Sequence, residues 1–237
     1  MLPIAKVPVS EQKDFEICPE GTHFARIYSI IDLGTQQGEY QGNPTIARKF
    51  KVDFETPTKK AIFNADKGEQ PFSLSDNINF KITTEKSATK AKLNKVIEAC
   101  GMKPVKDFNI FDLMGKTCMI TVGTYVANNG NKYANITNYS SVAEDLIDVK
   151  DKKFAPINKT KALYLDPEYF DEKVFESLPK FVKEKIEVTS EYAYCTKGLP
   201  SGLTVQTKNN KPKKEVVEEE DEENEIDVDK LGIQMPF

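Results

Sequence analysis

Tyrosines and cations recur at alternate positions in four segments of the chain that have the composition of β-strands. Alternate side chains of a strand point to the same side of a sheet, so these residues would share one outer face. Aromatic rings stack on bases, for about 1–3 kcal/mol each, and lysine and arginine attract phosphates. The pattern therefore predicts a face for single-stranded nucleic acid, although tyrosine is also simply common on the solvent side of strands. With one hairpin lysine included, the predicted nucleic-acid-binding residues are Arg26, Tyr28, Lys49, Lys51, Tyr125, Lys132, Tyr133, Asn135 and Tyr139.

Residues suited to catalysis or metal binding are sparse. The chain has one histidine, His23, and four widely spaced cysteines without a Cys-x-x-Cys pair, which favours reduced thiols over a disulfide scaffold or a zinc cluster. Asp32, Asp53 and Glu55 could be imagined as a metal-dependent nuclease site, but no further residue completes such a set. We therefore expect no enzymatic activity, no cofactor and no metal.

The pattern of thiols also favours a cytoplasmic protein. The start of the chain lacks the basic and apolar pattern of a secretory signal. No run approaches the roughly 18 apolar residues of a membrane span. We expect no membrane association.

The order of the predicted elements is that of an OB-fold. Strands are predicted at 22–33, 45–55, 117–127 and 132–142, with two short strand-like pieces between 61 and 83 and a long loop at 34–44. Ser87 is a plausible N-cap of a helix that Gly101 would end. The Asn-Gly within residues 128–131 predicts a hairpin. Five strands with a helix between the third and fourth predict a mainly β, five-stranded OB-fold barrel; another small α+β or sandwich domain is the alternative.

Strict alternation also predicts which strand residues face the core. In the first strand, Ala25, Ile27, Ile31 and Leu33 would point one way and Arg26, Tyr28 and Ile30 the other. In the last two strands, Ile120, Val122, Val126, Ala134 and Ile136 would face the core.

The remaining segments flank this OB-fold domain, which we assign to residues 21–142. Residues 1–20 are polar and predict an irregular N-terminal arm. Residues 143–200 predict a helical and irregular extension packed on the barrel, with helices starting at Asp166-Pro167 and Leu178-Pro179. Residues 201–237 predict a disordered linker and an acidic tail.

The charge of the chain is concentrated in that tail. Residues 215–237 hold ten acids and one base, a net charge of −9, whereas the whole chain carries −4, so the body carries +5. The tail ends in Met235, Pro236 and Phe237, which offer an aromatic side chain and a terminal carboxylate to a basic-rimmed pocket. These three residues are predicted to bind a partner protein; plain solubilisation is the alternative.

Several stretches of the chain resemble a family of tailed-phage single-stranded DNA-binding proteins. They are the Arg-x-Tyr-x-Ile-Ile-Asp-Leu-Gly-Thr-Gln run from Arg26 to Gln36, the glycine-rich loop after it, the strand ending Phe54-Glu55, and residues 178–186. The acidic tail ending in Pro-Phe is similar to the tails of bacterial and phage proteins of this kind. The bacterial protein often stacks bases on tryptophan, which this chain lacks, so stacking would fall to tyrosine or phenylalanine.

The resemblance implies an OB-fold protein that coats single-stranded DNA without sequence preference during phage DNA replication or recombination, in the cytoplasm of the infected bacterium. It also implies that the tail recruits replication or recombination proteins. The alternative is an annealing or loading accessory that mainly bridges replication proteins.

Overall fold

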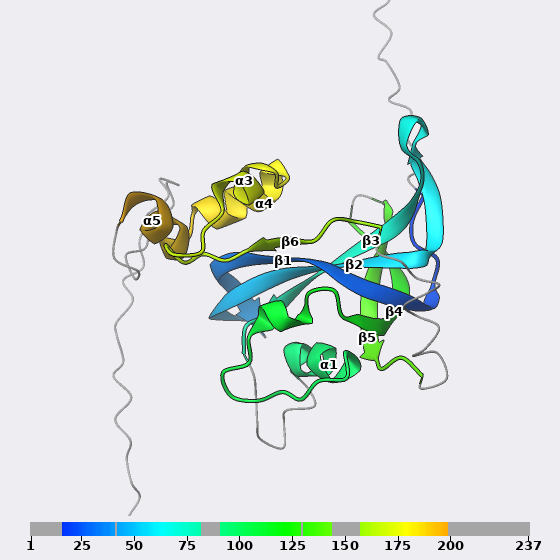
Figure 1. The fold of residues 1–237 in the computed structure, drawn as a ribbon, viewed down its shortest axis with the longest axis horizontal. Coiled ribbons are helices and arrows are strands. Elements are labelled where there is room, and N and C mark those ends of the chain that lie inside the picture. The colour runs from blue at the N-terminus through cyan, green and yellow to red at the C-terminus, as the bar shows by residue number, and fades with distance from the viewer. Residues whose placement is uncertain (1–15, 41, 82–90, 129, 144–156, 199–237) are drawn as a thin grey trace, which may run out of the picture. The chain divides into compact units, whose positions relative to one another are not determined.

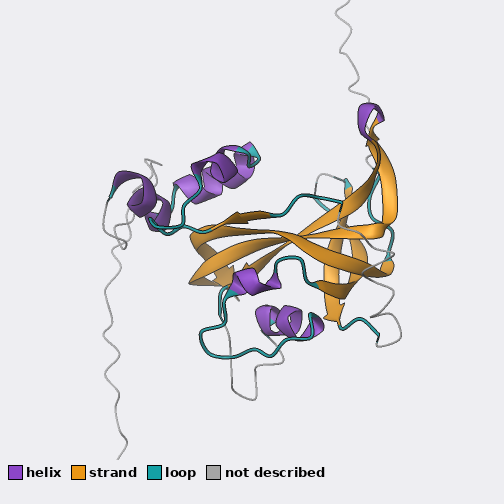
Figure 2. Cartoon of the chain, viewed as in Figure 1, coloured by secondary structure: helices purple, strands orange, loops and turns teal. Residues whose placement is uncertain are grey.

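The computed structural model describes residues 16–40, 42–81, 91–128, 130–143 and 157–198. This part of the chain is mainly β, with short helices on both sides of the sheet (Figures 1 and 2). The strands are β1 (Gly21–Tyr40), β2 (Asn43–Asn64), β3 (Gly68–Asn79), β4 (Thr117–Val126), β5 (Lys132–Ser140) and β6 (Lys161–Leu163). The helices are α1 (Lys92–Ala99), α3 (Glu172–Glu176), α4 (Lys180–Glu187) and α5 (Ser190–Lys197), with 3-10 turns η1 (Ala65–Lys67) and η3 (Ile110–Leu113).

Five antiparallel strands form a nearly closed barrel in the order β3-β2-β1-β4-β5. At the seam, the hydroxyl of Tyr139 on β5 donates to the carboxylate of Asp76 on β3. The helix α1 lies between β3 and β4 in the chain. The prediction of a mainly β, OB-type barrel is therefore confirmed.

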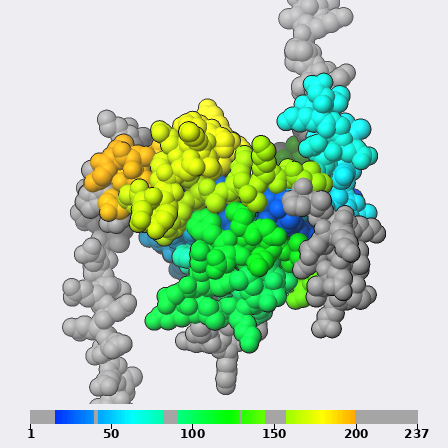
Figure 3. Space-filling model, in the orientation of Figure 1, coloured from blue at the N-terminus to red at the C-terminus, as the bar shows by residue number. Residues whose placement is uncertain are grey.

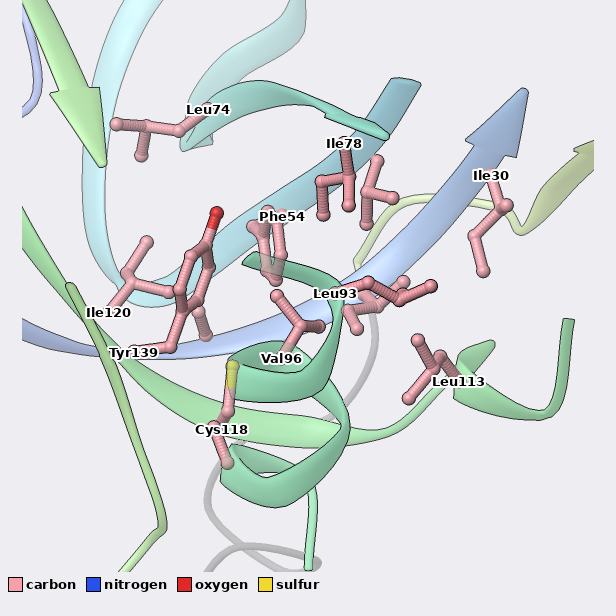
Figure 4. Packing of buried hydrophobic residues seen from close by; sticks show 14 of the residues in the cluster. Ile30, Phe54, Leu74, Ile78, Leu93, Val96, Leu113, Cys118, Ile120 and Tyr139 are labelled. Atoms are coloured by element: carbon pink, nitrogen blue, oxygen red, sulfur yellow. The ribbon is translucent and has the colours of Figure 1, made fainter. Parts of the chain in front are cut away.

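The helix α1 packs its apolar stripe into the barrel core. Leu93, Val96 and Ile97 are buried there, and Figure 4 shows Val96 and Leu93 facing Phe54 and Ile78 of the sheet. The helix begins at Lys92 with Ala91 as its N-cap, and the predicted N-cap Ser87 lies outside the described residues. Gly101 ends the helix as predicted, because its φ of 74° lets the amide of Met102 donate to Ile97 O at 3.0 Å.

An extra residue in β1 changes which of its later side chains face the core, so the prediction from strict alternation is wrong for that part of the strand. Ile27 pairs with Phe54 and Ser29 with Asp53, so Tyr28 forms a bulge. Beyond the bulge the alternation shifts by one residue. Ile30 therefore joins the barrel core, whereas Ile31 and Leu33 belong to a second cluster outside it.

A second bulge changes β5. Val122 pairs with Ile136 and Thr121 with Asn138, so Thr137 is the extra residue. Tyr139 consequently turns into the core, where its ring lies 5.6 Å from that of Phe54 (Figure 4). Ala134 and Ile136 pack on the core as predicted. Val126 does not: it is 68% exposed, because it lies at the end of its strand.

The segment after the barrel covers the outer face of β1. The strand β6 pairs in parallel with β1, and α3–α5 gather at one end of the sheet (Figure 1). Ile31 and Leu33 pack there against Leu163, Phe175 and other side chains of the extension. The helix predicted at Asp166 instead begins at Glu172, where Asp171 is the N-cap, whereas the helix after Leu178-Pro179 is present as α4.

Residues 34–44, predicted as a loop, mostly continue β1 into β2. The two strands pair as far as Tyr40 and Asn43. Gly34 adopts a φ of 67°, and a Cβ there would lie 2.8 Å from Thr189 Oγ1. Gly34 therefore allows β1 and the start of α5 to pack closely, and it does not mark a loop.

Candidate nucleic-acid interface

Four of the predicted binding residues lie together at the end of the β4–β5 hairpin. We call Tyr125, Lys132, Tyr133 and Asn135 the β4–β5 tip. Tyr125 and Tyr133 are cross-strand partners whose rings stack with centroids 5.8 Å apart and planes 29° apart. The two side chains are 50% and 39% exposed. Their position follows from strand pairing across the predicted Asn-Gly turn, where Ala127 N donates to Asn131 O at 2.9 Å.

The β4–β5 tip combines the groups that a nucleotide requires. The stacked tyrosines leave ring surface open to solvent, and a base can stack on it. Lys132, which pairs with Val126 next to the tyrosine pair, is exposed and adds a cation to the end of the hairpin, although strand alternation directs it to the other side from the rings. Asn135 is exposed opposite Gly123 and supplies a hydrogen-bonding amide. In OB-folds, the loop between the fourth and fifth strands is one of the elements that bind oligonucleotides.

Two further predicted residues, Lys49 and Lys51, lie on the outer side of β2 beside a polar row of β3. Lys49 pairs with Asn79 and Lys51 with Asn77. Lys51 forms an ion pair with Asp53, whose carboxylate also accepts from Ser75 Oγ at 2.6 Å. We call this surface the β2–β3 face; its members are Lys49, Lys51, Ser73, Ser75, Asn77 and Asn79.

Tyr28 lies at the edge of the β2–β3 face rather than fully open on it. Its hydroxyl shares a 2.6 Å hydrogen bond with Ser73 Oγ. Burial raises the pKa of this phenol. The bulge at Tyr28 thus leaves the ring only partly available for stacking.

Arg26 is buried, which makes its predicted role as a phosphate contact wrong. Its Nε donates to Glu55 Oε1 at 2.6 Å, and its Nη2 donates to Asn158 O at 2.9 Å. Glu55 is fully buried and also accepts from Asn158 N at 2.8 Å. Arg26 does lie on the outer face, as strand alternation predicts, but the segment before β6 covers that face.

Tyr139 is buried as well, so it cannot stack on a base. The residue is 9% exposed, and its hydroxyl donates to Asp76 across the barrel seam. Burial, and next the nearby charge of Asp76, raise the pKa of Tyr139. The bulge in β5 converts this predicted binding residue into a structural one.

The carboxylates considered for a nuclease site are engaged in separate structural contacts. Asp32 binds Arg48 and accepts from Leu165 N at 3.2 Å, Asp53 binds Lys51, and Glu55 binds Arg26. His23 Nε2 lies 2.7 Å from Pro19 O. Within the described ranges, no group of three or more histidine, cysteine or acidic residues could hold a metal ion.

An aromatic cavity of about 720 Å³ lies between η3 and the segment after β6, and no local pattern in the sequence indicates it. Figure 3 shows these two segments against each other on the face turned to the viewer, η3 in green and the later segment in yellow. The cavity's aromatic residues are Phe50, Phe80, Phe108, Phe111, Tyr164 and Tyr169. Besides the two tyrosine hydroxyls, Asp107 and Asn109 are the polar side chains among the described lining residues, and none of that lining is lysine or arginine. The cavity therefore lacks groups that would attract a phosphate.

A scan against protein-family models and a search of the curated proteins found no match to this chain. The described helices have at most eight residues, and none of them is long and apolar enough to cross a membrane. Met235, Pro236 and Phe237, the predicted partner-binding residues, lie outside the described part of the chain.

Proposed function

We propose that this chain is a sequence-nonspecific single-stranded DNA-binding protein of phage DNA replication or recombination. The observation that carries the proposal is the stacked and exposed tyrosine pair of the β4–β5 tip on an OB-type barrel. The phage context rests on the resemblance of the Arg26–Gln36 run to the tailed-phage family.

Binding of this kind needs no reaction and no base-specific contact. Every base has a π-face, so stacking on Tyr125 and Tyr133 tolerates any sequence. Lysines of the tip and of the β2–β3 face attract phosphates and release counterions, which makes affinity depend on salt. The protein would coat exposed strands and protect them.

The acidic tail supplies the second half of the proposal. Residues 215–237 carry a net charge of −9 and end in Pro236-Phe237. An aromatic side chain beside a run of acids fits recognition by a basic-rimmed pocket of another protein. The tail would thereby bring replication or recombination proteins to coated DNA.

Fluorescence anisotropy with labelled oligo-dT tests the DNA-binding proposal. Tyr125→Ala and Tyr133→Ala should each weaken binding by about 5- to 150-fold, the equivalent of 1–3 kcal/mol. Tyr194→Ala is the matched control, because this tyrosine is 40% exposed but lies on α5. A duplex of the same length should bind more weakly than the single strand. The proposal fails if the parent does not bind oligo-dT, or if both tip variants bind as tightly as the parent.

A further inference from the structure

A groove runs between the outer side of β2–β3 and the helix α4. It has a volume of about 180 Å³, and its lining includes Lys51, Ser75, Asn77, Phe181 and Lys185. We call it the α4 groove. The strand side belongs to the β2–β3 face, whereas the other wall comes from the extension after the barrel. OB-folds bind oligonucleotides on the face of these two strands.

The helix α4 presents an aromatic ring and a cation to this groove. Val182 and Ile186 bury one side of the helix in the second cluster. Phe181 and Lys185 are also four residues apart, so they lie one above the other on a neighbouring side. Phe181 is 59% exposed, although burial of a phenylalanine ring would stabilise the fold. Its exposure beside the groove leaves a ring free for stacking.

The lining of the groove favours an anion. It contains two lysines, and none of the described lining residues carries a carboxylate. The nearby Asp53 is already bound by Lys51 and Ser75. Asn77 is exposed and can donate hydrogen bonds, whereas the Ser75 hydroxyl already donates to Asp53. This chemistry contrasts with the 720 Å³ aromatic cavity, whose described lining has an aspartate and no cation.

The wall that carries Phe181 is held firmly against the barrel. Gln36 Nε2 donates to Leu33 O at 2.6 Å and to Lys185 O at 3.0 Å, so one side chain joins β1 to α4. The start of α5 packs directly on Gly34. A site on such a wall is preorganised, and less conformational entropy is lost when a ligand binds.

We propose that the α4 groove holds one nucleotide of a bound single strand, with its base on Phe181 and its phosphate between Lys185 and Lys51. The extension after the barrel is then part of the nucleic-acid interface and not merely a support. This inference rests on the proposed function and extends it to a second surface, distinct from the β4–β5 tip.

A tryptophan reporter tests the inference directly, because the chain has no tryptophan. Phe181→Trp should lose much of its fluorescence when oligo-dT is added, since a base stacked on the indole quenches it. Tyr194→Trp, at an exposed aromatic position on α5, should not respond. Phe181→Ala should weaken oligo-dT binding by about 5- to 150-fold.

The salt dependence of oligo-dT affinity tests the role of Lys185. Lys185→Ala should reduce the slope of log affinity against log salt by about 0.7, the value for one single-strand phosphate. Lys173→Ala, an exposed lysine on α3, should leave the slope unchanged. Because Phe181 and Lys185 are both exposed, we expect their variants to fold, and far-UV circular dichroism checks this.

The outcomes separate the two proposals. If the parent binds oligo-dT but Phe181→Trp is not quenched and Phe181→Ala binds like the parent, the α4 groove is not a nucleotide site and the proposed function stands. If the parent does not bind single-stranded DNA at all, both proposals fall.

Discussion

Replacing Arg26 separates a structural role from a DNA-binding role. Arg26→Ala removes the 2.6 Å bond to Glu55 Oε1 and the 2.9 Å bond to Asn158 O, while Glu55 stays buried. Removal of one partner of a buried ion pair destabilises a protein by about 3–5 kcal/mol. We therefore expect a large loss of stability and no loss of DNA affinity in the folded protein.

Urea denaturation followed by far-UV circular dichroism measures this loss. With an m-value of about 2 kcal/mol/M, a loss of 3–5 kcal/mol lowers the midpoint by about 2 M. The matched control is Lys132→Ala at the exposed tip. It should change stability by less than about 0.5 kcal/mol but weaken oligo-dT binding.

Replacing both partners by apolar residues should not restore Arg26→Ala to the parent's stability. Glu55 also accepts from Ile157 N at 3.3 Å and from Asn158 N at 2.8 Å. An apolar pair leaves both part-buried amides without this acceptor, whereas the cost of about 1–3 kcal/mol applies in full only to a buried group. The reasoning is refuted if Arg26→Ala unfolds at the parent's urea midpoint and binds oligo-dT less tightly, because Arg26 would then be a phosphate contact.

Three further predictions concern pH, salt and the tail. The raised pKa of Tyr139 means that its stabilisation is complete below pH 10, the approximate ordinary pKa of tyrosine, and is lost as the pH rises above it. Tyr139→Phe should therefore show a smaller fall in urea midpoint between about pH 9 and pH 11 than the parent. With Arg26 buried, the three remaining lysines predicted from the sequence give a salt slope near −2, which Lys185 of the α4 groove would bring to about −3; a titration that finds no salt dependence contradicts the electrostatic argument. Deleting residues 215–237 should raise oligo-dT affinity, most at low salt. Deleting only Met235–Phe237 should leave oligo-dT affinity unchanged but abolish the capture of a partner protein. If the full-length and the tip-deleted protein capture the same partners in a pull-down, the tip does not dock to a partner.

Local patterns in the sequence predicted the barrel. Contacts between distant segments determine which of the predicted nucleic-acid-binding residues are exposed. The apolar stripe of α1, its stop at Gly101 and the Asn-Gly hairpin are properties of neighbouring residues, and all three are present. The tip tyrosines were predictable for the same reason, because they flank a turn whose chemistry sets the pairing.

The errors have two physical causes. A bulge is defined by the pairing of one strand with another, so the extra residues Tyr28 and Thr137 left no mark on the alternation. Arg26 is covered by a segment 132 residues later in the chain, which no local pattern can reveal. The α4 groove was missed similarly, because its two walls come from separate parts of the sequence.

Glu55 and Asp32 accept hydrogen bonds from backbone amides that are made much later in the chain, and this order has a consequence for synthesis on the ribosome. Glu55 and Asp32 meet their arginines early, but the amides of Asn158 and Leu165 follow 103 and 133 residues later. At about 5–20 residues per second, Glu55 waits about 5–20 s for the amide of Asn158 to be made. During that interval Ile31 and Leu33 also lack the cluster that covers them. A nascent chain that stops before residue 157 is therefore an aggregation-prone intermediate that chaperones can bind, rather than a smaller finished domain.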